Sequence, residues 1–149
     1  LATNMTSGTL NINIVPGSNT IPPIQVCTSV PEFVNLTKNG ITQTYHYLSL
    51  LGDNTSYAVY FYVDPAKTIF AGHLQIINAG IGQGSTQVLH TFSSGGSNMV
   101  ITNPPVNVSI TEYGTIGQYM AGNFSGNFLQ PPTNTPYAIT CSFRIKRTF

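Results

Sequence analysis

The sequence predicts an all-β protein: an antiparallel two-sheet sandwich, jelly-roll-like, with about 8–10 strands and no substantial helix. Apolar and polar residues alternate with a period of two along several stretches, and clusters of Gly, Pro and Asn separate these stretches. No stretch has the spacing of apolar residues that an amphipathic helix requires. Because a sheet of this size must bury an apolar face against a second layer, two packed sheets are expected.

The first expected strand covers residues 9–15, where Leu10, Ile12 and Ile14 share one face. A Pro-rich spacer follows the strand and separates it from the rest of the chain. We therefore expect an N-terminal arm with its spacer at residues 1–23 and a sandwich domain at residues 24–149.

Short strands are expected next at residues 24–30 and 33–36, because Pro31 stops the first of them. Asn39 and Gly40 follow, and Asn-Gly between two β-forming runs is a strong hairpin signal. The hairpin leads into one expected strand from Ile41 to about Leu51.

Residues 56–63 are the expected central strand of the domain. Tyr60 and Tyr62 share one face of it, and the opposite face carries Tyr57, Val59, Phe61 and Val63. Because both faces are rich in large apolar or aromatic side chains, both are expected to be covered.

Two shorter strands at residues 73–77 and 87–92 flank a glycine-rich stretch, and residues 93–98 are expected to form a flexible turn. Strands at 106–112 and 118–128 follow. The last strand, 137–146, alternates most clearly, with Ile139, Cys141 and Phe143 on one face. One common core is expected to contain Tyr57, Val59, Phe61, Tyr119, Phe124, Ile139 and Phe143.

Charged residues are unusually scarce: they make up 6% of the chain, against roughly 25% in an average globular protein. With five Lys and Arg residues in all, no nucleic-acid partner is expected. The three basic residues near the end, Arg144, Lys146 and Arg147, fit a solvated strand end. No apolar run reaches the roughly 18 residues of a membrane span, so no membrane insertion is expected.

The chain begins with Leu1, which fits a mature form whose leader has been removed, and we expect an extracellular or cell-surface protein. Cys27 and Cys141 are expected to form one disulfide, and two free buried thiols are the alternative. His46, His73 and His90 are too scattered to complete a metal site, and no metal or cofactor is expected.

The last third of the chain carries three short motifs: Glu112-Tyr113-Gly114, the run from Gly122 to Gly126 (GNFSG), and Ser142-Phe143-Arg144. Together they resemble a C-terminal module found in many secreted, surface-associated β-rich proteins of Bacteroidetes bacteria. Most of those proteins have no assigned function. The resemblance implies an extracellular location and a β-sandwich, and it implies no reaction.

Catalysis by paired carboxylates needs two acids held close together. Asp53 and Asp64 lie in turns, where their side chains are expected to cap backbone N–H groups. Glu112 is expected to form an ion pair with one of the basic residues near the end of the chain. No nucleophile elbow or phosphate-binding loop is present, so we do not expect an enzyme.

Four tyrosines are candidate sugar contacts because they can lie together on adjacent strands: Tyr45, Tyr47, Tyr60 and Tyr62. Cross-strand tyrosine pairs also stabilise sheets, and that alternative stays open. Five N-x-S/T sequons are candidate N-glycosylation sites: Asn4, Asn35, Asn54, Asn107 and Asn123.

The scarcity of charge favours a subunit that assembles with copies of itself. The arm can pair with its own sheet, or it can be donated head to tail to a neighbouring copy, with Leu10, Ile12 and Ile14 at the interface. The sequence therefore predicts a structural subunit of an extracellular filament or surface layer. The alternative is a carbohydrate-binding or adhesin-like module whose partner is a polysaccharide.

Overall fold

The computed structural model describes residues 31–53, 55–77 and 80–149. All of the regular structure in these residues is β-strand, which confirms the all-β class. The strands are β1 (Phe33–Lys38), β2 (Ile41–Tyr45), β3 (Tyr47–Gly52), β4 (Ser56–Tyr62), β5 (Phe70–Ile77), β6 (Thr86–Ser94), β7 (Ser97–Asn98), β8 (Val100–Ile101), β9 (Asn107–Tyr113), β10 (Tyr119–Gln130) and β11 (Thr135–Lys146).

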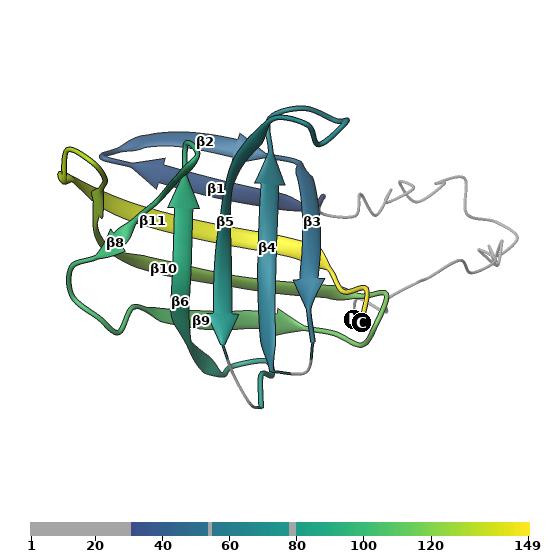
Figure 1. The fold of residues 1–149 in the computed structure, drawn as a ribbon. Coiled ribbons are helices and arrows are strands. Elements are labelled where there is room, and N and C mark those ends of the chain that lie inside the picture. Colours follow the sequence, from purple (N-terminus) through teal and green to yellow (C-terminus); the bar gives the residue numbers. More distant parts are fainter. Residues whose placement is uncertain (1–30, 54, 78–79) are drawn as a thin grey trace, which may run out of the picture.

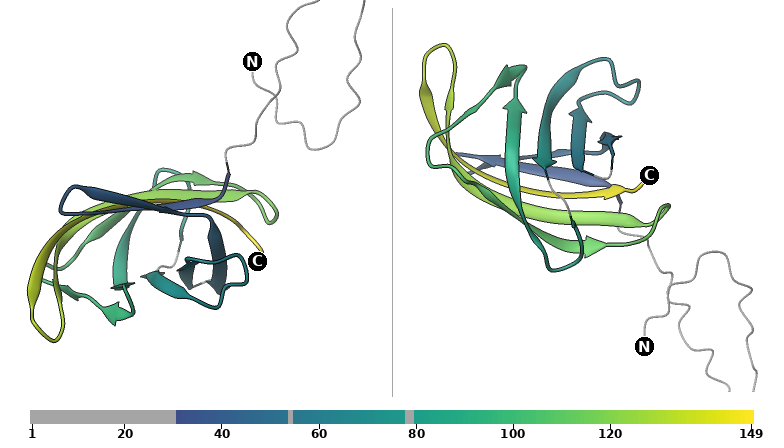
Figure 2. Two further views of the ribbon diagram at one scale, coloured as in Figure 1. Left: turned by 90° about the horizontal axis from the view of Figure 1, so that it is seen from above. Right: turned by 60° about the horizontal axis from the view of Figure 1, so that its bottom comes forward.

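The strands form one continuous sheet in the order β2-β1-β11-β10-β9-β6-β5-β4-β3, with β7 beside β6 and β8 beside β10. Every pair is antiparallel, and most neighbours in the sheet follow one another in the chain. Figures 1 and 2 show the sheet folding over itself, so that β3–β6 cross in front of the layer formed by β9, β10, β11, β1 and β2. The sheet is thus nearly closed and barrel-like, and the predicted two-sheet jelly roll is not confirmed.

The corner between β2 and β3 lies at His46, within the stretch that the sequence predicts as one strand. The chain passes there from the rear layer to the front layer (Figure 1). His46 Nδ1 lies 3.1 Å from the backbone oxygen of Glu32, the residue before β1. The predicted hairpin is confirmed, because Asn39 and Gly40 have φ values of 47° and 85°, as a two-residue turn of the I′ type requires.

The core lies between the two layers. From the front layer it receives Tyr57, Val59 and Phe61 of β4, and the rings of Phe92, Phe124 and Phe128 contact one another across the layers. Ile139 and Phe143 of β11 are also buried. The predicted core is therefore confirmed for all of its members except Tyr119.

Tyr119 and Val63 were placed on buried faces wrongly. Tyr119 lies an odd number of residues from Phe124, so the alternation of β10 turns it toward the outer face, where it is partly exposed. Val63 follows the end of β4 and is 58% exposed. The alternation of inward and outward residues along β10 is enough to predict that Tyr119 faces outward. The position at which β4 ends cannot be predicted in this way, because Val63 continues the alternation of apolar residues.

The turn predicted at residues 93–98 is present, and it connects β6 to β7 as a tight hairpin. Gly95 and Gly96 form its tip with φ values of 63° and 77°, which glycine adopts without strain. β8 was not predicted at all. The expected strands at residues 9–15 and 24–30, including Leu10, Ile12, Ile14 and Cys27, lie outside the described residues. No helix in the described ranges is long and apolar enough to cross a membrane.

Candidate functional site

The two turn aspartates cap backbone groups, as predicted. Asp53 Oδ1 accepts hydrogen bonds from the Thr55 and Ser56 N–H groups at 2.7 and 3.1 Å. Asp64 accepts from the N–H groups of Thr68 and Ile69. The Thr55 hydroxyl also donates to Asp53 Oδ1 at 2.6 Å, and this hydrogen bond together with the backbone ones lowers the pKa of Asp53. The hydrogen bond from the Ile69 N–H is the main cause of the lowered pKa of Asp64. Both carboxylates therefore stabilise turns.

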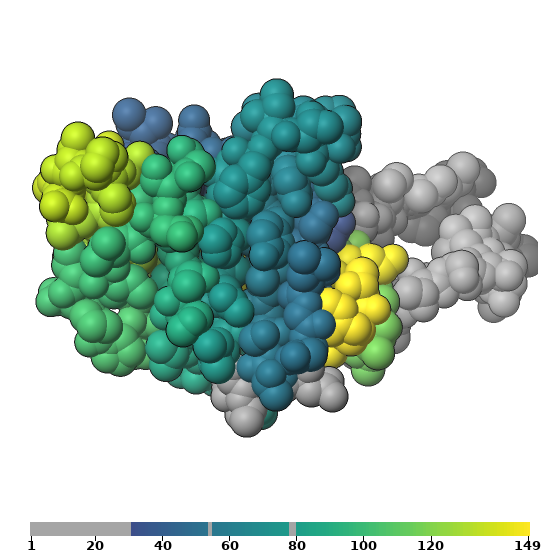
Figure 3. Space-filling model, viewed as in Figure 1, coloured from purple at the N-terminus to yellow at the C-terminus, as the bar shows by residue number. Residues whose placement is uncertain are grey.

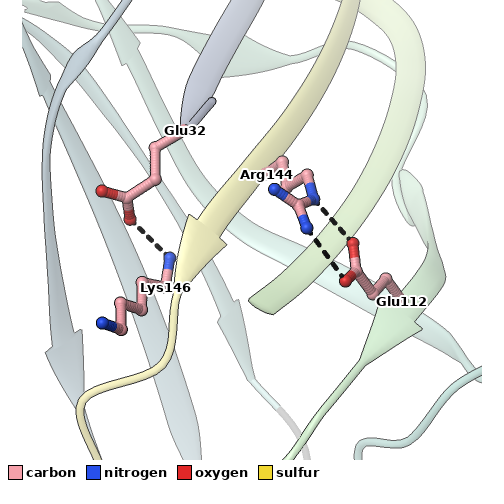
Figure 4. Close-up of polar contacts among 4 residues, drawn as sticks. All are labelled: Glu32, Glu112, Arg144 and Lys146. Carbon is pink, nitrogen blue, oxygen red and sulfur yellow. Dashed lines mark hydrogen bonds and ion pairs between the residues drawn. The ribbon is translucent and has the colours of Figure 1, made fainter. Parts of the chain in front are cut away.

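Glu112 forms the predicted ion pair, with Arg144 as its partner (Figure 4). Arg144 Nε donates to Glu112 Oε2 at 2.8 Å, and the guanidinium lies over the Tyr119 ring at 3.5 Å from its centre. The Arg144 side chain is only 16% exposed, so the expectation of a solvated strand end is wrong for this residue. The ion pair raises the pKa of Arg144.

Arg147 is also not solvated. Its guanidinium lies 4.2 Å from the centre of the Tyr113 ring and donates to the Gly114 carbonyl and the Tyr57 hydroxyl. The Tyr57 and Tyr113 hydroxyls are 2.8 Å apart, and burial together with this hydrogen bond raises the pKa of Tyr113 to about 12. Lys146 is exposed, and its backbone N–H donates to Glu32 (Figure 4). Arg147 and Tyr113 therefore join the rear layer to Tyr57 of the front layer at this end of the sheet.

Cys141 is a fully buried thiol that faces the core, and its burial raises its pKa. Its expected partner, Cys27, lies outside the described residues, so the disulfide stays a prediction. A bond to Cys141 would require the Cys27 sulfur to reach the interior, between the two layers.

The sequons occupy different environments. Asn107 and Asn123 are exposed on the outer faces of β9 and β10, which is the orientation that a glycan on a strand requires. Asn35 is half-buried, and its Oδ1 accepts a hydrogen bond from the Thr44 hydroxyl at 2.7 Å. Asn4 and Asn54 lie outside the described residues.

Among the four candidate tyrosines, Tyr60 and Tyr62 lie in a row of rings on the outer face of β4 and β5, which we call the aromatic strip. Its members are Tyr62, Phe70, Tyr60 and His73. Successive ring centres are 6.1, 6.2 and 5.4 Å apart, and Tyr60 stacks on His73 with a 23° angle between the planes. This face points toward the viewer in Figure 3, over the blue and teal strands.

Tyr45 and Tyr47 lie beside the strip, at the corner between β2 and β3. Together with Tyr62 they line a shallow hollow of about 340 Å³, which also includes Gln43 and His46. Tyr47 is the register partner of Tyr62, while the Tyr45 ring packs against Phe61 of the core at 5.0 Å. Tyr62 therefore joins the hollow to the strip, and the structure brings all four predicted tyrosines into one region.

A chain of hydrogen bonds fixes His73 within the strip. Ser93 Oγ accepts the His73 backbone N–H at 2.9 Å and lies 2.7 Å from Nδ1, so its own O–H donates to Nδ1. Nε2–H then donates to Thr91 Oγ1 at 3.1 Å, and Thr91 donates to Gln75 Oε1. This order assigns the neutral Nε2–H tautomer to His73, and burial lowers its pKa.

Gly72 makes this arrangement possible. A side chain at Gly72 would overlap the backbone oxygen of Ser93 and the ring of Phe61. Because glycine has no such side chain, β5 can approach β6 closely enough for the contact between His73 and Ser93.

The sequence did not predict Phe70 or His73 as members of the site. These residues are three positions apart, so plain alternation places them on opposite faces of a strand. In the structure the register shifts between Phe61 and Tyr62, and Ala71 is the extra residue on β5. This bulge turns both side chains to the outer face, and no local signal in the sequence reveals it.

Chemically, the region combines partly exposed rings with hydroxyl and amide groups and contains no carboxylate. Rings of this kind bind apolar faces of a ligand, while Thr91 and Gln75 supply neutral hydrogen-bonding groups. Comparison of the chain with protein-family models, with curated proteins and with solved structures finds no significant match.

Proposed function

We propose that this protein is an extracellular carbohydrate-binding domain, which holds a glycan against the aromatic strip and the hollow beside it. The observation that carries this proposal is an unbroken row of aromatic side chains on the outer face of three neighbouring strands, β3, β4 and β5. Its members, in order, are Tyr47, Tyr62, Phe70, Tyr60 and His73. A sugar ring presents an apolar C–H face that stacks on an aromatic ring and a rim of hydroxyls that form hydrogen bonds.

The chemistry of the surroundings supports a neutral ligand. Phe70 is 40% exposed and Tyr47 38% exposed, so their rings are accessible. Two charged groups lie on the connection between β4 and β5, and both are engaged by the protein: Asp64 accepts from the N–H groups of Thr68 and Ile69, and Lys67 donates to the Leu48 carbonyl and to Ser49 Oγ on β3. The Lys67 ammonium group therefore binds β3 and not a ligand. Ligand recognition at this face would then depend on ring stacking and on neutral hydrogen bonds.

Retention of the purified protein on insoluble polysaccharides, such as cellulose, xylan, mannan and β-1,3-glucan, tests the proposal. Phe70→Ala and Tyr62→Ala are expected to weaken retention by roughly 2- to 10-fold each, the value of one aromatic contact. Ile116→Ala is the matched control, because Ile116 is 67% exposed and lies on the β9–β10 connection. Retention on none of the four polymers, or equal retention of all variants, would reject this site.

The filament subunit is the second candidate, and the unpaired edges of the sheet favour it. β2 and β3 end the hydrogen-bonded order, so each has one edge without a partner strand among the described residues. Lys67 binds the Leu48 carbonyl of β3, a common protection of an edge strand. β2 is exposed along most of its length, and Ile41 is 73% exposed, so β2 is the better acceptor for a donated strand.

Electron microscopy of the full chain and of a form lacking residues 1–15 distinguishes the two functions. Strand donation predicts ordered polymers of the full chain and none of the truncated form, with polymerisation restored by a peptide of residues 1–15. Monomers of the full chain that are retained on a polysaccharide favour the carbohydrate-binding domain instead.

A further inference from the structure

A second hollow opens on the outer side of the rear layer, where the sheet divides. Along β10, the residues up to Phe124 pair with β9, and Phe128 and Leu129 pair with β8. Between them, residues 125–127 of β10 pair with neither strand on this side. The hollow at this break has a volume of about 400 Å³. Its polar lining, which we call the amide groove, is Asn103, Asn107, Asn123, Asn127, Ser109 and Ser125.

The four side-chain amides of the groove are exposed, and within the described ranges none of them forms a hydrogen bond to another residue. Elsewhere in the same ranges, Asn35 and Asn39 both accept hydrogen bonds through their side chains. Each amide offers two N–H donors and one acceptor oxygen, so the groove presents a dense set of neutral donors and acceptors to solvent. No charged or titratable side chain lines it.

Uncharged polar side chains also continue from the groove onto the neighbouring strands. The strand register places one row of side chains across six neighbouring strands, in the order Thr44, Asn35, Ser142, Asn123, Ser109 and Thr86. Neighbouring strands are about 4.8 Å apart, so this row continues the hydrogen-bonding pattern of the groove over most of the rear layer. Asn123 belongs to both the row and the groove.

We propose that the amide groove is a second binding site, specific for a neutral glycan and separate from the aromatic strip. Sugar hydroxyls both donate and accept hydrogen bonds, as do the Asn amides and Ser hydroxyls of the groove. Because the groove has no charged side chain, an ionic ligand gains no charge-assisted hydrogen bond there. The groove recognises its ligand by hydrogen bonds, because the one aromatic side chain among the described residues that line it, Phe124, is 3% exposed and cannot serve as a stacking platform.

The two sites lie on opposite sides of the molecule. The strip lies on the outer face of β4 and β5, and the groove lies on the outer face of β9 and β10. Figure 2 shows these two pairs of strands in opposite layers. One copy of the protein can therefore hold two glycan chains at once and cross-link them.

Nuclear magnetic resonance of the full chain titrated with cellohexaose, xylohexaose and mannohexaose tests the groove directly. At least one of these probes is expected to shift the side-chain amide signals of Asn107 and Asn123. Asn123→Asp keeps the shape and adds a charge, and it is expected to weaken the groove titration by roughly 5- to 10-fold. Asn98→Asp, the same change on exposed β7, is the control and leaves the titration unchanged.

Each site is then tested in the absence of the other. The Phe70→Ala variant is expected to bind the probes at the groove as the wild type does, because Phe70 does not line the groove. The groove can therefore be tested even if the aromatic strip binds no glycan. If both sites bind, the wild-type protein cross-links a soluble glucan or mannan into a precipitate, and either single variant raises the protein concentration at which precipitation begins. The groove proposal is overturned if no probe shifts the amide signals, if Asn123→Asp binds as the wild type does, or if intact mass shows a glycan attached to Asn107 or Asn123.

Discussion

The ring of Phe149 stacks on the ring of Tyr57, with centroids 5.5 Å apart and an angle of 10° between the planes. Tyr57 belongs to β4 of the front layer, and Phe149 follows β11 of the rear layer. Arg147 and Tyr113 complete the cluster through the guanidinium contact and the hydroxyl pair. Side chains, rather than a ladder of backbone hydrogen bonds, therefore join the two layers at this end of the sheet.

Phe149→Ala is expected to lower the free energy of unfolding by about 1–2 kcal/mol, because it removes one stacked pair and part of the apolar cover over Tyr57. Urea unfolding followed by circular dichroism measures the loss. Ile116→Ala serves as the control, since its exposed side chain makes no comparable contact. Equal midpoints for the two variants would mean that this contact does not stabilise the fold.

Phe143→Ala is expected to cost about 3–5 kcal/mol, because Phe143 is 1% exposed and its removal leaves a cavity between the layers. Thermal and urea unfolding both report this loss. Ile41→Ala, at a position 73% exposed on β2, should change stability by less than about 0.5 kcal/mol. A loss under about 1 kcal/mol for Phe143→Ala would contradict its burial.

The Glu112 and Arg144 side chains are expected to couple by about 0.5–1 kcal/mol in a double-mutant cycle of Glu112→Gln and Arg144→Met. The value is modest because Glu112 is 41% exposed and solvent screens the pair. Tyr119 contacts the same guanidinium, so Arg144→Met alone should cost more than Glu112→Gln. Additive single effects would show that the ion pair contributes nothing.

Stability is expected to fall as the pH decreases below about 6.5, the ordinary pKa of histidine. Burial lowers the pKa of His73 in the folded protein, so in this window the unfolded chain binds a proton that the folded chain does not. The loss levels off below the folded-state pKa. The pKa values of Asp53 and Asp64 are lowered from 3.8, so these carboxyl groups act at more acidic pH.

Urea midpoints measured at a series of pH values test this expectation. His73→Gln should flatten the slope below about pH 6.5, whereas His90→Gln at an exposed position of β6 should leave it unchanged. A slope that survives in His73→Gln would assign the effect to another group.

The Cys141 thiol is expected to resist alkylation in the folded protein, because its burial disfavours the thiolate that reacts. Intact mass of the denatured, non-reduced protein then tests the predicted bond to Cys27. A disulfide makes the mass about two hydrogens lighter than that of the reduced form and blocks alkylation until reductant is added. Two thiols that react in denaturant without reductant would rule the bond out.

The strands that the sequence predicts best are those with strict alternation. Ile139, Cys141 and Phe143 on β11 follow this rule, and all three are buried. The Asn39-Gly40 turn was equally clear, because a two-residue hairpin of this type needs positive φ at both positions.

The candidate site was predicted only in part, because two of its features depend on register. The bulge at Ala71 places Phe70 beside His73, and a second shift leaves His90 as the extra residue on β6 and brings Thr91 beside Gln75. Bulges arise from the fit between strands and not from the composition of one strand. The corner at His46 was not predicted, because the residues on both sides of it have the composition of a β-strand and the sequence contains no turn signal between them.

The pairing of β1 with β11 determines how the domain responds to force. The two strands are antiparallel, and Phe33 at the start of β1 lies opposite Arg144 near the end of β11. Tension applied between residues 32 and 147 therefore pulls both strands from the same end, across the strand axis, and loads the hydrogen bonds one after another instead of together. We therefore expect β1 and β11 to separate at a lower force than two strands that are pulled along their length, where all of the hydrogen bonds are loaded together.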